Sequence, residues 1–171
     1  MNNIKRICVV GAPGTGKTTL SKKLAKIYNL PVCHLDSFHQ LPNWELRDEK
    51  ERDNLILEET KKEEWILDGT FTNTLFERVN RADLVIFLDY TSIAALKGVI
   101  KRIIKDHGKE KSDMPGCKEK FDLSFILYVA TYNKQRRNII LDILHKGDKE
   151  KLIIFKNRRE LKKWISQFEN K

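Results

Sequence analysis

The chain has 171 residues, of which 40% are hydrophobic and 33% charged, and this composition predicts a single globular domain over residues 1–171 rather than a fibrous or low-complexity chain. No apolar run reaches membrane-spanning length, no signal-peptide pattern opens the chain, and the three cysteines have neither disulfide nor zinc spacing, so we expect a cytoplasmic protein without a membrane partner. The net charge of +9 lies in the second half, because residues 97–171 contain 20 basic and 10 acidic side chains.

Apolar strand-like runs alternate with helical periodicities along the whole chain. Strands are expected at about 4–10, 32–35, 65–68, 84–88 and 152–155, and helices at about 16–29, 47–63, 72–80, 92–106, 123–145 and 158–169. Asp48 followed by Glu51 resembles a capping box at the start of the second helix. This alternation predicts an α/β fold with a parallel sheet that is covered by helices on both faces.

A phosphate-binding loop connects the first strand to the first helix. It reads Gly11, Ala12, Pro13, Gly14, Thr15, Gly16, Lys17 and Thr18, followed by Thr19, and it matches the pattern G-x-x-x-x-G-K-[ST]. The glycines allow the backbone N–H groups to approach phosphate oxygens at a helix N-terminus. Lys17 is expected on the β- and γ-phosphates and Thr18 on Mg²⁺, so the loop predicts binding of a nucleoside triphosphate.

Residues after the second strand are candidates for binding a phosphoryl acceptor. Asp36 lies at the carboxyl edge of the predicted sheet, where it would take a proton from an acceptor hydroxyl or cap a turn. Trp44 would line an acceptor pocket or belong to the core, whereas His34 and His39 are assigned no catalytic role. The acceptor-binding region is expected at about 36–64.

Two aspartates end later strands. Asp68 ends the strand 65–68 and is followed by a glycine, so it is the preferred metal residue beside Thr18, through the water shell of Mg²⁺. Asp89 ends the strand 84–88 and is the second candidate for the metal, but it is interpreted instead as a cap of the helix that starts near Ser92.

A polar segment, 107–122, separates two predicted helices. It is interpreted as a lid without regular structure over the triphosphate, with a merely flexible loop as the alternative. Arg102 precedes this segment, and Arg136 and Arg137 follow it on the next helix. These arginines are expected to stabilise the transferring phosphoryl group, although each of them is also compatible with a plain surface position.

These motifs together resemble the adenylate-kinase-like group of phosphate-loop kinases and, more closely, the DNA topology modulation proteins. The closer resemblance covers nearly the whole chain and rests on the stretches 34–36 with Pro42 and Trp44, 65–69, 113–117 and 119–122. It implies a five-stranded parallel sheet, ATP with Mg²⁺ and a lid, but no particular acceptor.

The sequence departs from nucleoside monophosphate kinases at two places. The stretch 69–72 lacks the arginine that binds an acceptor phosphate in that group, with Arg47 or Arg78 as possible substitutes, and Gly98 stands where an arginine often stacks on adenine. The resulting expectation is a Mg²⁺-dependent kinase of the nucleotide and nucleoside kinase type that acts on a nucleotide, a nucleoside or a hydroxylated metabolite. The alternative is a nucleotide-dependent regulator associated with DNA, but nucleic acid is not expected as the primary partner, because the cations are spread over several helices without base-stacking motifs.

Overall fold

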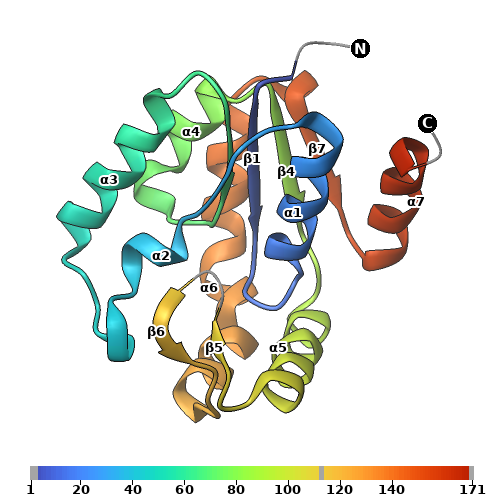
Figure 1. Ribbon diagram of the computed structural model, residues 1–171. Coiled ribbons are helices and arrows are strands. Elements are labelled where there is room, and N and C mark those ends of the chain that lie inside the picture. Colours follow the sequence, from blue (N-terminus) through green and yellow to red (C-terminus); the bar gives the residue numbers. More distant parts are fainter. Residues whose placement is uncertain (1–3, 112–113, 170–171) are drawn as a thin grey trace.

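The computed structural model describes residues 4–111 and 114–169, so that Ser112 and Asp113 of the predicted lid lie outside the described residues. The expected parallel sheet of five strands is confirmed (Figure 1). Its spatial order is β2-β3-β1-β4-β7, and all pairs are parallel. The strands are β1 (Arg6–Gly11), β2 (Val32–His34), β3 (Trp65–Asp68), β4 (Leu84–Leu88) and β7 (Leu152–Phe155).

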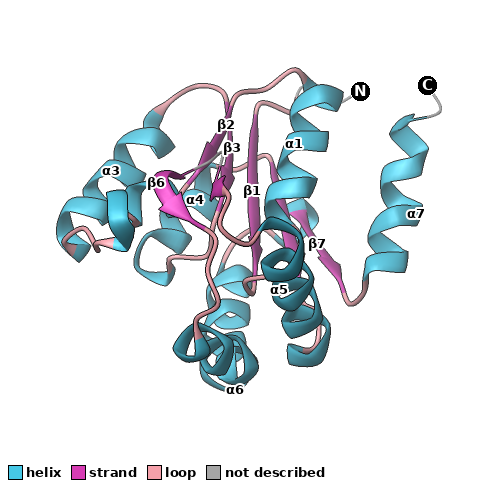
Figure 2. Ribbon diagram, turned by 60° about the horizontal axis from the view of Figure 1, so that its bottom comes forward, coloured by secondary structure: helices cyan, strands magenta, loops and turns pink. Residues whose placement is uncertain are grey.

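Helices cover both faces of the sheet, as the alternating pattern predicts (Figure 2). They are α1 (Lys17–Tyr28), α2 (Asp36–His39), α3 (Glu49–Lys61), α4 (Leu75–Arg81), α5 (Ser92–Asp106), α6 (Leu123–Lys146) and α7 (Arg158–Glu169). Short 3₁₀ turns occupy Pro42–Trp44, Thr72–Thr74 and Lys149–Lys151. The predicted helix 72–80 therefore begins as a 3₁₀ turn, and the predicted helix 47–63 is shorter, because Asp48 caps it by accepting from the N–H groups of Lys50 and Glu51.

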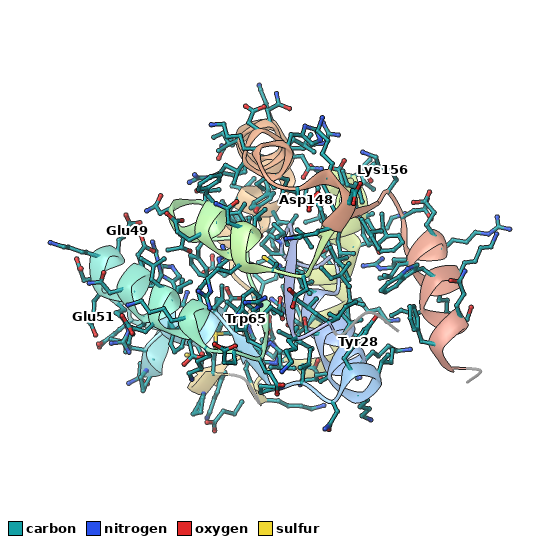
Figure 3. All side chains as sticks on the ribbon, turned by 90° about the horizontal axis from the view of Figure 1, so that it is seen from above. Tyr28, Glu49, Glu51, Trp65, Asp148 and Lys156 are labelled. Atoms are coloured by element: carbon teal, nitrogen blue, oxygen red, sulfur yellow. The ribbon has the colours of Figure 1, made fainter. Side chains whose placement is uncertain are left out.

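The hydrophobic core has two layers because neighbouring strand residues point to opposite faces. On β1, Ile7 and Val9 pack toward Leu20 and Leu24 of α1 and Ile165 of α7. The other face of the sheet packs against α3, α4, α5 and α6 through residues that include Cys8, Val10, Ile56, Val79, Val99 and Ile140. In the view from above, Trp65 lies toward the middle of the molecule and Glu49 lies at its edge on α3 (Figure 3).

The lid segment contains regular structure, which corrects the expectation of a structureless insertion. Two short antiparallel strands, β5 (Glu110–Lys111) and β6 (Met114–Lys118), form it. They rest on the Pro42–Trp44 turn, far away in the sequence, and this long-range support explains why the local sequence pattern gave no strand signal. Among the described residues, no helix is both long and apolar enough to cross a lipid bilayer.

The interpretation of Asp89 as a helix cap is wrong. Thr91 caps α5, since its side chain accepts from the N–H group of Ala94. Asp89 is instead buried and binds two cations, Arg137 through both carboxylate oxygens at 2.7 and 2.8 Å and Lys156 through Oδ2. Burial alone would raise the pKa of Asp89, but the hydrogen bonds from Arg137 and Lys156 outweigh that effect and lower it.

Candidate active site

The phosphate-binding loop links β1 to α1 at the carboxyl end of the central strand. Gly14 and Gly16 have φ angles of 80° and 98°, values that an L side chain rarely adopts, and Gly16 is the N-cap of α1. The N-terminus of α1 carries no acidic side chain in its first turn, so its N–H groups and dipole are available to an anion. The Lys17 ammonium donates to the carbonyl of Ala12 at 3.2 Å.

The loop is packed backbone to backbone against α5. A Cβ atom added at Gly14 would lie 2.3 Å from the carbonyl oxygen of Ala95, and one added at Gly98 would lie 2.0 Å from that of Gly14. Arg158 of α7 closes this contact, because its Nη2 donates to the Gly14 carbonyl at 2.9 Å. The phosphate-binding loop and α5 therefore leave no space for a side chain at position 98.

The predicted metal residues differ in their surroundings. Thr18 lines the cavity above the loop, whereas Asp68 is 4% exposed, at the end of β3, and is not among the residues that line this cavity. Asp68 Oδ2 lies 2.9 Å from Nδ1 of His34, a pairing that sequence reasoning missed. One hydroxyl on the cavity wall and a carboxylate outside that wall fit a Mg²⁺ ion only if phosphates and water supply most of its ligands.

Asp36 lies on the wall of the same cavity as the first residue of α2. Its carboxylate is exposed and forms no capping hydrogen bond, so the capping alternative has no support in the structure. Opposite it, α6 presents Tyr128, Tyr132 and Arg136 at intervals of four residues, all of them lining the cavity. Burial raises the pKa of Tyr128, while Arg136 lowers it and Asp36 raises it further, which indicates that the three side chains share one electrostatic environment.

Arg52 is a cavity residue that sequence reasoning missed. It is 5% exposed, lies 4.8 Å above the ring of Phe71 and binds Asp53 Oδ1 through Nε and Nη2. The ring of His39 packs edge-on against the same Phe71, and burial, followed by the charge of Arg52, lowers the pKa of His39. The spacing of Arg52 from Ile56, one helical turn along the buried face of α3, was the signal that pointed inward.

Neither arginine proposed as a substitute for the missing acceptor-phosphate ligand faces the cavity. Arg78 is fully buried and donates to the carbonyls of Gly69, Thr70 and Phe71 at 2.8 to 3.2 Å, so it fixes the backbone of the loop after β3. Arg47 donates to the carbonyl of Phe38 and to the carboxylate of Glu51. Both expectations are corrected: these two side chains have structural partners.

The lid hairpin is attached to the Pro42–Trp44 turn, in the region where sequence analysis expects the acceptor, through Trp44. The indole N–H of Trp44 donates to the Lys118 carbonyl at 3.0 Å, and the ammonium groups of Lys111 and Lys120 lie 5.1 and 5.7 Å from its ring. Trp44 has a φ angle of 65°, which is strained for a bulky residue and persists only where surrounding contacts enforce it. Trp44 thus belongs to the cavity wall and not to the core.

The three predicted arginines have different positions. Arg102 and Arg136 line the cavity, and Arg102 also contacts the lid through Glu119 at 3.1 Å. Arg137 is held by both oxygens of Asp89 and does not line the cavity, so the structure does not bring it together with the phosphate-binding loop.

A single cavity of about 1970 Å³ joins these parts. Its walls include the phosphate-binding loop, Asp36 and Arg52 on the acceptor side, the lid residues Lys111 and Glu119, and the α6 face. Pockets for one small ligand usually have about 300 to 1,000 Å³, so this cavity has room for a nucleotide and a second molecule beside it.

Solved structures with a similar fold are small-molecule kinases. Shikimate kinase from Acinetobacter baumannii, solved in complex with shikimate, has a TM-score of 0.64 at 19% identity, with 96% of this chain and 92% of that chain covered. Shikimate kinase from Bacteroides thetaiotaomicron gives 0.57 at 18% identity, covering 98% and 97%. A gluconokinase from Sinorhizobium meliloti 1021 gives 0.54 at 13% identity, covering 98% and 91%.

At such low identity these structures establish the shared fold. Comparison with curated protein sequences finds no significant match. A protein-family model described as an AAA domain matches residues 7–114, which contain the phosphate-binding loop, the acceptor side and α5. With more than half of its length matched, the chain belongs to the AAA domain family.

Proposed function

We propose that this protein is a kinase that transfers the γ-phosphoryl group of ATP, in the presence of Mg²⁺, to a hydroxyl group of a small acceptor. The observation that carries the proposal is the continuous cavity, which puts Lys17 of the phosphate-binding loop and the exposed carboxylate of Asp36 on the walls of one space. Phosphoryl transfer requires donor and acceptor to lie together in this way, away from bulk water.

The donor half of the cavity would hold ATP. Residues 11–19 would cradle the phosphates with their N–H groups, and Lys17 would leave the Ala12 carbonyl for the β- and γ-phosphate oxygens. Thr18 would bind Mg²⁺ directly and Asp68 through water, and the ion would neutralise charge on the phosphates. Arg102 and Arg136 would stabilise the charge that spreads over the transferring group.

The acceptor half would be formed by residues 36–64 together with α6. Asp36 would accept the proton of the attacking hydroxyl. The guanidinium groups of Arg52, which lies over the ring of Phe71, and of Arg136 both line the cavity and favour a small acceptor that carries a negative charge in addition to its hydroxyl. The solved neighbours are kinases of small molecules by name, and one of them holds shikimate, which agrees with such an acceptor.

The charge of the second half of the chain has an explanation within this proposal. More than half of its cations line the cavity, where a triphosphate would need them; they are Lys97, Lys101, Arg102, Lys105, Lys111, Lys120, Arg136, Arg158, Arg159, Lys162 and Lys163. The resemblance to DNA topology modulation proteins remains a prediction. Retention on DNA that falls steeply with increasing salt would favour the regulator with which that name is associated.

The test is ATP turnover with Mg²⁺ against nucleoside monophosphates, nucleosides and small hydroxylated acids. We expect ADP release to depend on one acceptor class and to fall by at least about 100-fold in Lys17→Ala, because the charge opposite the γ-phosphate is lost. Lys26→Ala, an exposed lysine in the last turn of the same helix, is the matched control and should leave the rate unchanged. Tight ATP binding without any acceptor-dependent turnover would contradict the proposal.

A further inference from the structure

Glu119 is a buried carboxylate that the proposed reaction does not use. It is 4% exposed, at the base of the lid, and it lines the cavity next to the phosphate side. Its backbone is fixed, since its N–H donates to the Lys109 carbonyl at 2.9 Å and its carbonyl accepts from the N–H of Gly108 at 2.8 Å. A negative charge placed beside a polyphosphate site opposes binding of the polyphosphate, so its presence there requires a reason.

The reason lies in its partners. Glu119 Oε2 lies 3.1 Å from Nε of Arg102 and 3.7 Å from Nζ of Lys111, so two cations from different elements meet at one oxygen atom. Arg102 comes from α5 and Lys111 from β5. The carboxylate therefore lies between two cations that line the cavity.

Glu119 contacts the Nε side of the Arg102 guanidinium. The contact is an ion pair without the alignment of a hydrogen bond, and the guanidinium also lies 6.0 Å from the ring of Phe125. Among residues 4–111 and 114–169, no hydrogen bond joins the Nη1 and Nη2 atoms of Arg102 to another side chain or to the backbone. The ion pair therefore leaves both terminal groups available, and these groups match two phosphate oxygens.

We propose that Glu119 is a positioning residue whose ion pair keeps Arg102 on the cavity wall, with the terminal guanidinium groups available to the γ-phosphate of bound ATP. This inference rests on the proposed function and deepens it. Trp44 binds the carbonyl of Lys118, the residue that precedes Glu119. The ion pair between Glu119 and Arg102 therefore depends on the contact of the hairpin with the Pro42–Trp44 turn. Recognition of the γ-phosphate is thereby coupled to a part of the molecule that contacts the acceptor.

A double-mutant cycle tests this coupling without relying on any acceptor. The variants are Glu119→Gln, Arg102→Ala and the double variant, and the measurement is calorimetric binding of the β,γ-methylene analogue of ATP and of ADP, each with Mg²⁺. We expect Glu119→Gln to reduce the preference for the analogue over ADP by roughly five- to tenfold, the size of one charge-assisted contact. In the Arg102→Ala background the same substitution should have no further effect.

Glu110→Gln is the matched control, because Glu110 is an exposed lid carboxylate that accepts from the backbone N–H of Gly116. Equal losses in Glu110→Gln and Glu119→Gln would show a general role in lid structure and overturn the inference. Additive effects of the Glu119 and Arg102 substitutions would overturn it as well. The cycle measures binding and not turnover. If the variants show the expected coupling but the wild-type protein turns over no acceptor, the proposed function is contradicted and the inference about Glu119 is not.

Discussion

The donor side and the acceptor side of the cavity are built in different ways. The phosphate-binding loop is one continuous segment, residues 11–19, whose conformation follows from its own glycines and from the strand and helix that flank it. The acceptor side is assembled from α2, the Pro42–Trp44 turn, α3, the loop after β3, the lid and α6. A site formed by local sequence can be found by its motif, whereas a site formed by distant segments depends on contacts that no motif records.

Asp36→Asn gives the largest expected effect that is confined to the acceptor side. The amide keeps the size of the side chain but cannot take a proton, so we expect turnover to fall by about 100-fold with ATP affinity unchanged. Steady-state kinetics together with nucleotide binding measure both quantities. Asp48→Asn is the matched control on the same segment, because asparagine also caps a helix. A parallel loss of ATP affinity would show that the two sides are not separable.

Arg78→Met tests whether the acceptor side depends on buried polar contacts. The substitution leaves three carbonyls of the loop 69–71 without their donor, so we expect a loss of about 3 kcal/mol in the free energy of unfolding. Chemical denaturation measures it, with Arg81→Met, an exposed arginine of the same helix, as the control. If the two variants are equally stable, the bonds of Arg78 do not hold the loop.

Gly98→Ala probes the contact between the donor side and α5. The added methyl group would meet the Gly14 carbonyl at 2.0 Å, so the phosphate-binding loop must shift, and we expect ATP affinity to fall by roughly tenfold. Gly108→Ala separates contact from backbone strain, because Gly108 has a φ of 73° but open space around it. That control should lose stability and keep its ATP affinity. Unchanged affinity in Gly98→Ala would mean that the loop and α5 move independently.

The smallest expected effect concerns the pH dependence of stability at Asp89. The folded-state pKa of Asp89 is lowered by Arg137 and Lys156 against the effect of burial, so its contribution is present above the unfolded-state pKa of about 4 and is lost as the pH falls through the folded-state value. Asp89→Asn should therefore be less stable than the wild type at pH 7, with the difference shrinking below about pH 4. Thermal unfolding across this range measures it; a constant difference would contradict the assignment.

The sequence predicted the five strands and the phosphate-binding loop because both are encoded by neighbouring residues. Val85, Ile86 and Phe87 mark a buried strand by themselves, and Lys17 is placed by the glycines around it. The pairings of Asp68 with His34 and of Asp89 with Arg137 could not be predicted in the same way, because they join residues 34 and 48 positions apart. For the same reason Arg78, Arg102 and Arg137 looked alike in the sequence, although one is a backbone anchor, one lines the cavity and one is a partner of a buried carboxylate.

The contact between the lid hairpin and the Pro42–Trp44 turn also controls the reactivity of a thiol. Cys117 of β6 is buried, and its Sγ donates to the Leu41 carbonyl at 3.3 Å, at the same junction where Trp44 meets the hairpin. Cys8 is buried in the core and Cys33 is half-buried in the sheet, so neither depends on this junction. Cys117 therefore becomes accessible to an alkylating reagent only when the hairpin separates from the Pro42–Trp44 turn. The rate of Cys117 alkylation accordingly reports the frequency of that separation.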